Sequence, residues 1–373
     1  MLFFAFLLIS YLFLFIFSYL WVDFNLSLTH YPFLVNFLDK FQHWGYFNRF
    51  LSAKIYLGLL IILFGSQLYL LFSNFLQKQS LKKLLVLAGI VVLLGSLSYP
   101  FLSHDIFNYL FDAKIIWHYR QNPYLRTPQS FSGDHWLRFM HWVHRTCLYG
   151  PIWLLYTLIP GLLSFGKFVI NFYGLKLLNG LLFFSTGWLL LKINKNNKRV
   201  FTYWFFNPFL VIELLINAHN DLLMIALAVM GFYFWQKKKK WGWLFFLFSV
   251  ASKYVSVLLL PAFILKKHYK LILLGLALIL LIGFIIKIES FQSWYFAWLF
   301  MLLPFLKLSP RSWMFFLAGE LLILLVKYYP FLRLGQWQTT GYLYLQGFFV
   351  LLALILAFDF FKIRLRKVDR DRV

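Results

Sequence analysis

The chain has 373 residues, of which 62% are hydrophobic, 23% aromatic and only 13% charged. Soluble domains are close to half apolar and a quarter charged, so this composition argues strongly against a water-soluble globular protein. The 36 Lys and Arg residues outnumber the 12 Asp and Glu residues and give a net charge of +24. Because the basic residues occur in short stretches between apolar segments, they indicate cytoplasmic loops in contact with anionic lipid, and no nucleic acid is expected as a partner.

Apolar segments that are long enough, or nearly so, to cross a bilayer follow one another along the whole chain. They lie near residues 2–22, 55–73, 84–101, 150–168, 169–191, 201–217, 221–236, 241–265, 271–288, 294–306, 312–326 and 342–361. They predict an all-α polytopic membrane protein, a bundle of about ten transmembrane helices plus re-entrant or interfacial helices. We expect one integral membrane domain over residues 1–373, a retained anchor at its start and a basic cytoplasmic tail at 362–373.

Two of these segments do not fit a simple alternation of crossings. Between Lys240 and Lys266 there are only about 25 residues, whereas two full helices need about 40. A pair of half-helices with Lys253 near the turn satisfies the charge pattern, and such broken backbone is tolerated at membrane depth only where it faces protein or a wet cavity. The same parity argument makes residues 150–168, which contain two prolines, a candidate re-entrant or interfacial segment.

The widest gap between apolar segments, residues 102–149, is rich in Trp, Tyr and His. We expect it to form an outer-face catalytic loop with interfacial helices. If a helix begins at Asp105, the seven-residue step places Asp112 on nearly the same face, with Tyr109 between them. Two carboxylates and a phenol then face one place; the alternative is the exposed polar face of an interfacial helix.

A polar stretch, Asn-Ala-His-Asn-Asp at residues 217–221, joins two apolar segments. Asp221 is explained by helix capping alone. Capping does not require His219 and Asn220 beside it, so a polar site at the membrane boundary is an equally good interpretation.

Three histidines and the single cysteine lie close together at His135, His141, His144 and Cys147. Side chains at three-residue intervals point in successively different directions around a helix, so the four cannot converge on one ion, and we expect no metal. An amphipathic helix at headgroup level, with Trp and Arg interleaved, explains the run better, and its Arg145 is a candidate contact for a lipid phosphate.

Several short motifs occur in an order that resembles the multispanning GT-C glycosyltransferases, in particular the prokaryotic mannosyltransferase-type members that use a polyprenyl-phosphate sugar. They are Asp105-Ile-Phe-Asn-Tyr-Leu-Phe-Asp112, Asn122-Pro123-Tyr124, Tyr149-Gly150-Pro151-Ile-Trp153, Asn207 to Glu213 with Asn217 to Met224, Ser252-Lys253, and Trp294-Tyr295 with Trp298. The resemblance covers about residues 84–306. Two departures, Arg120 in place of a frequent Gly and Gly150 in place of a Pro, bear on the acceptor rather than on the class.

The resemblance implies an inverting transfer of a hexose, mannose above all, from a polyprenyl-phosphate sugar to a lipid or glycan acceptor on the outer face of the plasma (inner) membrane. Asp105 is the expected base, and Lys253, His219 and Arg145 are the candidates, in that order, for the donor phosphate. The expected substrate-binding residues are Tyr109, Asp112, Asn122, Tyr149, His219, Asn220 and Asp221. No cofactor is expected, because neither a Gly-x-Gly-x-x-Gly loop nor a Walker lysine occurs.

An ion-coupled transporter or lipid flippase is the alternative, because such carriers also contain buried ionisable residues like Glu213, Glu320 and Lys253. Glu213 is expected to face Asn217, Lys253 or another group inside the bundle. Carriers usually have two related halves with a site near the midplane, whereas here the acids gather in one outer loop and no repeat is visible, so the enzyme is favoured. A non-catalytic scaffold is a third possibility, and it would tolerate Asp105→Ala.

Overall fold

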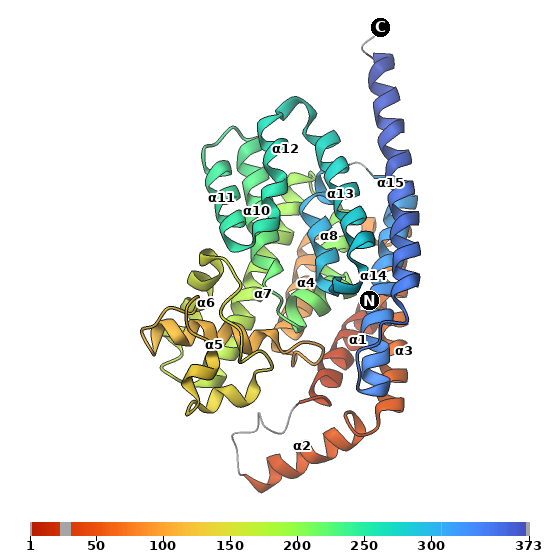
Figure 1. Ribbon diagram of the computed structural model, residues 1–373. Coiled ribbons are helices and arrows are strands. Elements are labelled where there is room, and N and C mark those ends of the chain that lie inside the picture. The colour runs from red at the N-terminus through yellow and green to blue at the C-terminus, as the bar shows by residue number, and fades with distance from the viewer. Residues whose placement is uncertain (1, 23–30, 307, 371–373) are drawn as a thin grey trace. The chain divides into compact units, whose positions relative to one another are not determined.

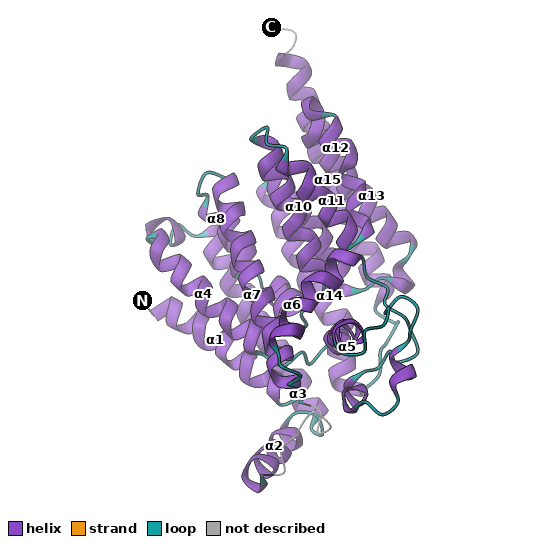
Figure 2. Ribbon diagram, turned by 90° about the vertical axis from the view of Figure 1, so that its left-hand side faces the viewer, coloured by secondary structure: helices purple, strands orange, loops and turns teal. Residues whose placement is uncertain are grey.

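A computed structural model of the chain describes residues 2–22, 31–306 and 308–370, which excludes the last three residues of the expected tail at 362–373. Helices and connecting loops make up this part, and no strand occurs in it (Figure 2). Within it, six helical segments are long and apolar enough to cross a membrane, and six shorter apolar helices accompany them. The protein is therefore an all-α polytopic membrane protein, as its composition predicts.

The chain divides into two compact units, Met1–Tyr254 and Val255–Val373. The helices of the first unit are α1 (Leu2–Tyr19), α2 (Pro32–Trp44), α3 (Arg49–Phe72), α4 (Leu81–Leu97), α5 (Asp105–Trp117), α6 (Pro151–Leu163), α7 (Phe168–Ile193), α8 (Lys198–Phe205), α9 (Pro208–Leu210), the π-helix η5 (Val211–Ile216), α10 (Asp221–Gln236) and α11 (Trp241–Ser252), with short 3-10 turns η2 (Leu76–Lys78), η3 (Pro128–Phe131) and η4 (His135–Phe139) (Figure 1).

The second unit begins within the 3-10 helix η6 (Tyr254–Leu259). Its further elements are α12 (Leu260–Ile264), η7 (Lys266–His268), α13 (Tyr269–Ile286), η8 (Ile288–Ser290), η9 (Ser293–Met301), η10 (Leu303–Phe305), α14 (Pro310–Leu334) and α15 (Tyr342–Arg370). Helix α15 packs against α13 and α14. Inside this unit the Ser293 and Tyr328 hydroxyls lie 2.6 Å apart, so two buried polar groups of an apolar region satisfy each other.

Helix α7 is the centre of the first unit, because it packs against α4, α6, α8, α10 and η5. Small residues on α7 allow these neighbours to approach closely. A Cβ atom at Gly180 would collide with Ser96 of α4, and one at Gly187 would collide with Trp204 and Phe205 of α8. Glycines at such close approaches are typical of helix packing in membranes, where tight van der Waals contact replaces the hydrophobic effect.

Helix α2 was not expected from the sequence. Phe33, Phe37 and Trp44 are exposed along one face of this helix, and Lys40 lies on the same face, seven residues after Phe33. A segment of 13 residues with a charge among its apolar side chains lacks the continuous apolar run that marks a membrane crossing. In Figure 1 α2 runs across the ends of α1 and α3.

The amphipathic helix expected around His135 to Cys147 does not form, and this prediction is wrong. Only the 3-10 turn η4 is helical, and the following residues up to Gly150 are irregular. The backbone groups of this stretch pair with distant segments instead: Gln129 donates to the Val143 carbonyl, and Cys147 donates to the Pro123 carbonyl. Tertiary hydrogen bonds here replace the local helical ones.

Candidate active site

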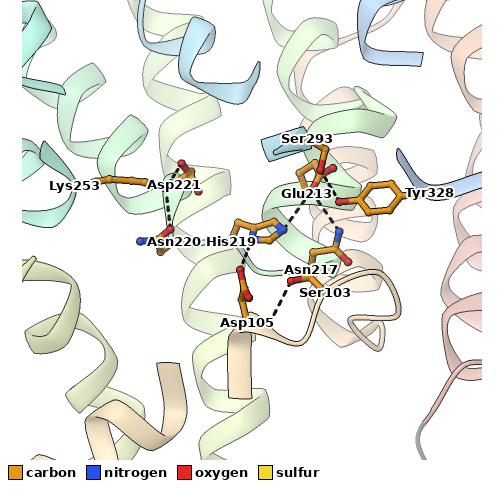
Figure 3. A network of polar contacts seen from close by, with 10 residues as sticks. All are labelled: Ser103, Asp105, Glu213, Asn217, His219, Asn220, Asp221, Lys253, Ser293 and Tyr328. Atoms are coloured by element: carbon orange, nitrogen blue, oxygen red, sulfur yellow. Dashed lines mark hydrogen bonds and ion pairs between the residues drawn. The ribbon is translucent and has the colours of Figure 1, made fainter. Parts of the chain in front are cut away.

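Helix α5 begins at Asp105, as the sequence predicts, and carries this carboxylate in its first turn. The Ser103 hydroxyl accepts a hydrogen bond from the Asp105 backbone N–H at 3.3 Å and fixes the start of the helix. An acidic side chain is favourable at this end because the helix dipole is positive there. The Asp105 side chain is 18% exposed, and its Oδ2 lies 3.6 Å from Nδ1 of His219 (Figure 3).

His219 connects Asp105 to a second, deeper carboxylate. Its other ring nitrogen, Nε2, lies 3.3 Å from Oε2 of Glu213, and both side chains are fully buried. Asn217 donates from Nδ2 to the same carboxylate oxygen at 3.4 Å, which confirms Asn217 as one of the partners expected for Glu213. The result is a carboxylate–imidazole–carboxylate row in which only Asp105 reaches the surface.

The backbone around His219 is unusual. The π-helix η5 precedes it, and Ala218 has a left-handed φ of 57°. A non-glycine residue in this conformation costs roughly 1–2 kcal/mol. The His219 N–H donates to the Glu213 carbonyl at 3.2 Å, so this backbone conformation holds His219 next to the helix that carries Glu213.

A second pair lies beside this row. The Lys253 ammonium donates to Oδ1 of Asp221 at 2.7 Å and to Oδ1 of Asn220 at 3.3 Å (Figure 3). Asp221 begins α10 but also binds this cation, so capping alone does not account for it. The helix break predicted at Lys253 is confirmed: α11 ends at Ser252, and Lys253 has an extended backbone.

Gly150 brings the end of the loop that follows α5 against this break. Its N–H donates to the Ser252 carbonyl at 3.2 Å, and a Cβ atom at position 150 would overlap the carbonyl of Ala251. Glycine is therefore required where the loop ends, and this contact brings Tyr149 close to the segment that carries Lys253.

Tyr109 and Tyr149 pack together near both carboxylates of α5. The rings of Tyr109 and Tyr149 meet edge to face at 5.0 Å. Burial raises the pKa of Tyr149, and the negative charges of Asp105 and Asp112 add to this effect. Burial also raises the pKa of Asp112 to about 7, although a hydrogen bond with the Cys147 thiol opposes the shift. Both carboxylates of α5 therefore act on the same phenol.

Two other expected site residues lie elsewhere on the loop. Asn122 forms a turn, its Oδ1 accepting from the Tyr124 N–H at 2.9 Å, and the Arg145 guanidinium lies 4.2 Å from the centre of the Trp142 ring. Among the described residues, no hydrogen bond or ion pair links either of them to Asp105 or Lys253. Tyr124, which donates to the Tyr149 carbonyl at 2.8 Å, was not expected as a separate contributor.

No group of three or more His, Cys, Asp or Glu side chains in the described part of the chain is placed to hold a metal ion. The candidate site consists of carboxylates, one imidazole, phenols and one ammonium group. This set suits proton transfer and the binding of hydroxyls and of a negative group.

A family model described as alpha-(1->6)-mannopyranosyltransferase, N-terminal domain, matches residues 33–267, which is well over half of the chain and spans every residue of the site. The chain belongs to this mannosyltransferase family. It is thus a GT-C type glycosyltransferase of the membrane, with a sugar donor and a glycan or lipid acceptor as substrates. A search of curated proteins and a search of solved structures each found no match.

Proposed function

We propose that this mannosyltransferase takes its mannose from a polyprenyl-phosphate sugar and transfers it, with inversion, to a lipid or glycan hydroxyl on the extracytoplasmic face of the plasma membrane. The observation that carries the proposal is the partly exposed carboxylate of Asp105, backed by the fully buried His219 and Glu213. A carboxylate held in this way is suited to take the proton of a hydroxyl that binds in front of it.

In the proposed step, Asp105 accepts the proton of the acceptor hydroxyl while the acceptor oxygen forms its bond to the anomeric carbon. The bond from that carbon to the phosphate oxygen breaks, and its electrons leave with the polyprenyl phosphate. Lys253, one-fifth exposed and held by Asp221, stabilises this negative charge. His219 serves Asp105 rather than the phosphate, which departs from the role weighed for it from sequence.

Sugar recognition falls to polar residues around these two groups and to Asn122 farther along the loop. We propose Tyr109, Asp112, Asn122, Tyr149, Asn220 and Asp221 for the hydroxyls and Arg145 as a second cation of the outer loop. The orientation is supported by α10, which begins at the site and ends at the basic run Lys237 to Lys240. Since basic loops favour the cytoplasm, the opposite end of α10 belongs on the outer face.

The test uses purified protein in liposomes with radiolabelled polyprenyl-phosphate mannose or GDP-mannose as the donor. We expect label transfer from the lipid-linked donor only. Asp105→Asn should lower the rate by about 10²- to 10⁴-fold, the range of a general base. Asp39→Asn, the same change at an exposed carboxylate of α2, should leave it unaltered. Use of the nucleotide sugar by the wild type, or normal turnover by Asp105→Asn, would contradict the proposal.

A further inference from the structure

Lys176 is a fully buried lysine inside the membrane-spanning helix α7. Its Nζ donates to the backbone carbonyl of Leu215 at 2.8 Å and to that of Ile216 at 2.7 Å. Within the described part of the chain it forms no ion pair with an acid. A buried lysine normally needs an acidic partner, so two neutral carbonyls as its partners call for a reason.

The reason lies at the end of the π-helix η5. The last carbonyls of a helix have no backbone donor ahead of them, and leaving them unpaired in an apolar interior is unfavourable. Here the chain turns away at Ala218 with its left-handed φ, and the next N–H groups return to earlier carbonyls, Asn217 to Ile212 and His219 to Glu213. Lys176 supplies the missing donors.

The two carbonyls stand directly before the residues of the site. Asn217 follows Ile216 in the chain, and His219 comes two residues later. On another side of η5, Gly95 of α4 leaves just enough space for Leu215, since a Cβ there would come within 3.1 Å of the Leu215 Cβ. The end of η5 is thus held by packing from α4 and by two directed hydrogen bonds from α7.

We infer that Lys176 is a positioning residue: by binding the carbonyls of Leu215 and Ile216, it fixes the turn at Ala218 and so holds His219 between Asp105 and Glu213. It touches no reacting group. Two hydrogen bonds to successive carbonyls set the rotation of η5 about its axis, and this rotation decides where the imidazole stands. The consequence for catalysis rests on the proposed function, whereas the structural consequence does not.

Hydrogen exchange of the full-length protein in detergent tests the structural part. The reporters are the amides of Asn217 and His219, whose protection depends on the turn. Lys176→Met should speed their exchange by at least about tenfold while leaving α4 and the rest of α7 unchanged. Lys192→Met makes the same change at the exposed end of the same helix and should match the wild type. Unchanged exchange of these two amides in Lys176→Met would overturn the inference.

If Lys176→Met does not yield folded protein, Lys176→Gln takes its place, because its amide keeps one donor. We then expect an intermediate rise in exchange at the same two amides. If the two amides of a folded Lys176→Gln exchange at the wild-type rate, the inference is overturned as well.

Mannose transfer supplies the second readout. A displaced His219 should lower kcat by about 10²-fold, the size expected for a misplacement of about 1 Å, with the apparent KM of donor and acceptor unchanged. Faster exchange with a normal kcat would show Lys176 to be structural only and would overturn its positioning role. If the wild type transfers no mannose, the proposed function fails, while the exchange result still decides whether Lys176 fixes the turn.

Discussion

Two lysine–aspartate pairs of the first unit show how differently the same chemistry is used. Lys114 of α5 pairs with Asp134 in the loop that follows this helix. That pair is enclosed by its own surroundings: Tyr119 donates to Asp134 at 2.7 Å, the Trp136 N–H donates at 2.9 Å, and the Lys114 ammonium lies 4.0 Å from the centre of the Trp136 ring. The two side chains are 10% and 4% exposed.

The pair of Lys253 and Asp221 is built for something else. Its acid is fully buried, whereas its cation is 21% exposed and stands at the break after α11. The pair of Lys114 and Asp134 therefore serves to hold a loop together, and the pair at the break holds a cation where a ligand can reach it. The protein places its enclosed charges at structural positions and its partly open charges, Asp105 and Lys253, at the proposed reaction.

Removal of the two cations gives the largest contrast. Lys253→Ala should raise the apparent KM for the lipid donor by about 10- to 100-fold, because a charge-assisted hydrogen bond is lost, and should affect the acceptor less. Lys114→Ala should leave both KM values unchanged and lower the free energy of unfolding by about 1–3 kcal/mol. Steady-state kinetics with each substrate varied, together with thermal unfolding, distinguish the two. Equal effects of Lys253→Ala on donor and acceptor would argue against the phosphate role.

A smaller effect is expected where the loop that ends at Gly150 meets the break after α11. Gly150→Ala should destabilise the protein by about 2 kcal/mol, because the new methyl group collides with the Ala251 carbonyl. Gly133→Ala in the same loop meets no atom within 4 Å and is the matched control. Thermal unfolding in one detergent measures both. Equal melting temperatures for the two variants would show that the close approach of Gly150 to Ala251 does not contribute to stability.

The smallest effect concerns pH. The pKa of Asp112 rises from 3.8 to about 7, chiefly through burial, so the folded protein binds a proton between these values that the unfolded chain releases. Its contribution to stability is therefore present at low pH and is lost as the pH rises from about 4 to about 7. Asp112→Asn should remove this loss.

The measurement compares wild type and Asp112→Asn at pH 5 and pH 8. We expect the wild type to lose more stability than the variant over this interval. Parallel unfolding curves at both pH values would mean that Asp112 does not bind a proton on folding. For Asp134, burial is outweighed by the hydrogen bonds from Lys114, Trp136 and Tyr119, which lower its pKa, so the opposite slope is expected there at acid pH.

The sequence predicted best those features that depend on the free-energy cost of placing a group inside a membrane. Apolar length located most of the membrane helices, and the bounds expected for α10, 221–236, are those observed. Acids inside apolar segments cost free energy, and for this reason Glu213 and Asp221 stood out. In the structure Glu213 is bonded to Asn217, and Asp221 is paired with Lys253. The helix break at Lys253 followed from counting residues against the thickness of a bilayer.

Features that depend on tertiary contacts could not be predicted in this way. The irregular run after His135 is set by backbone hydrogen bonds to remote segments, and the π-helix η5 by its packing between α4 and α7. Lys176 was also missed. The signal for it existed, since a lone lysine in an apolar segment is costly, but its partners are backbone carbonyls that no sequence pattern marks.

The central claim is that Asp105 and His219 act as one unit, and a double-mutant cycle tests it most directly. Single-turnover rates of mannose transfer, with enzyme in excess, are measured for Asp105→Asn, His219→Gln and the double variant. If His219 works only through Asp105, the double variant should be no slower than Asp105→Asn alone. Losses that multiply, as for two independent groups, would contradict the account.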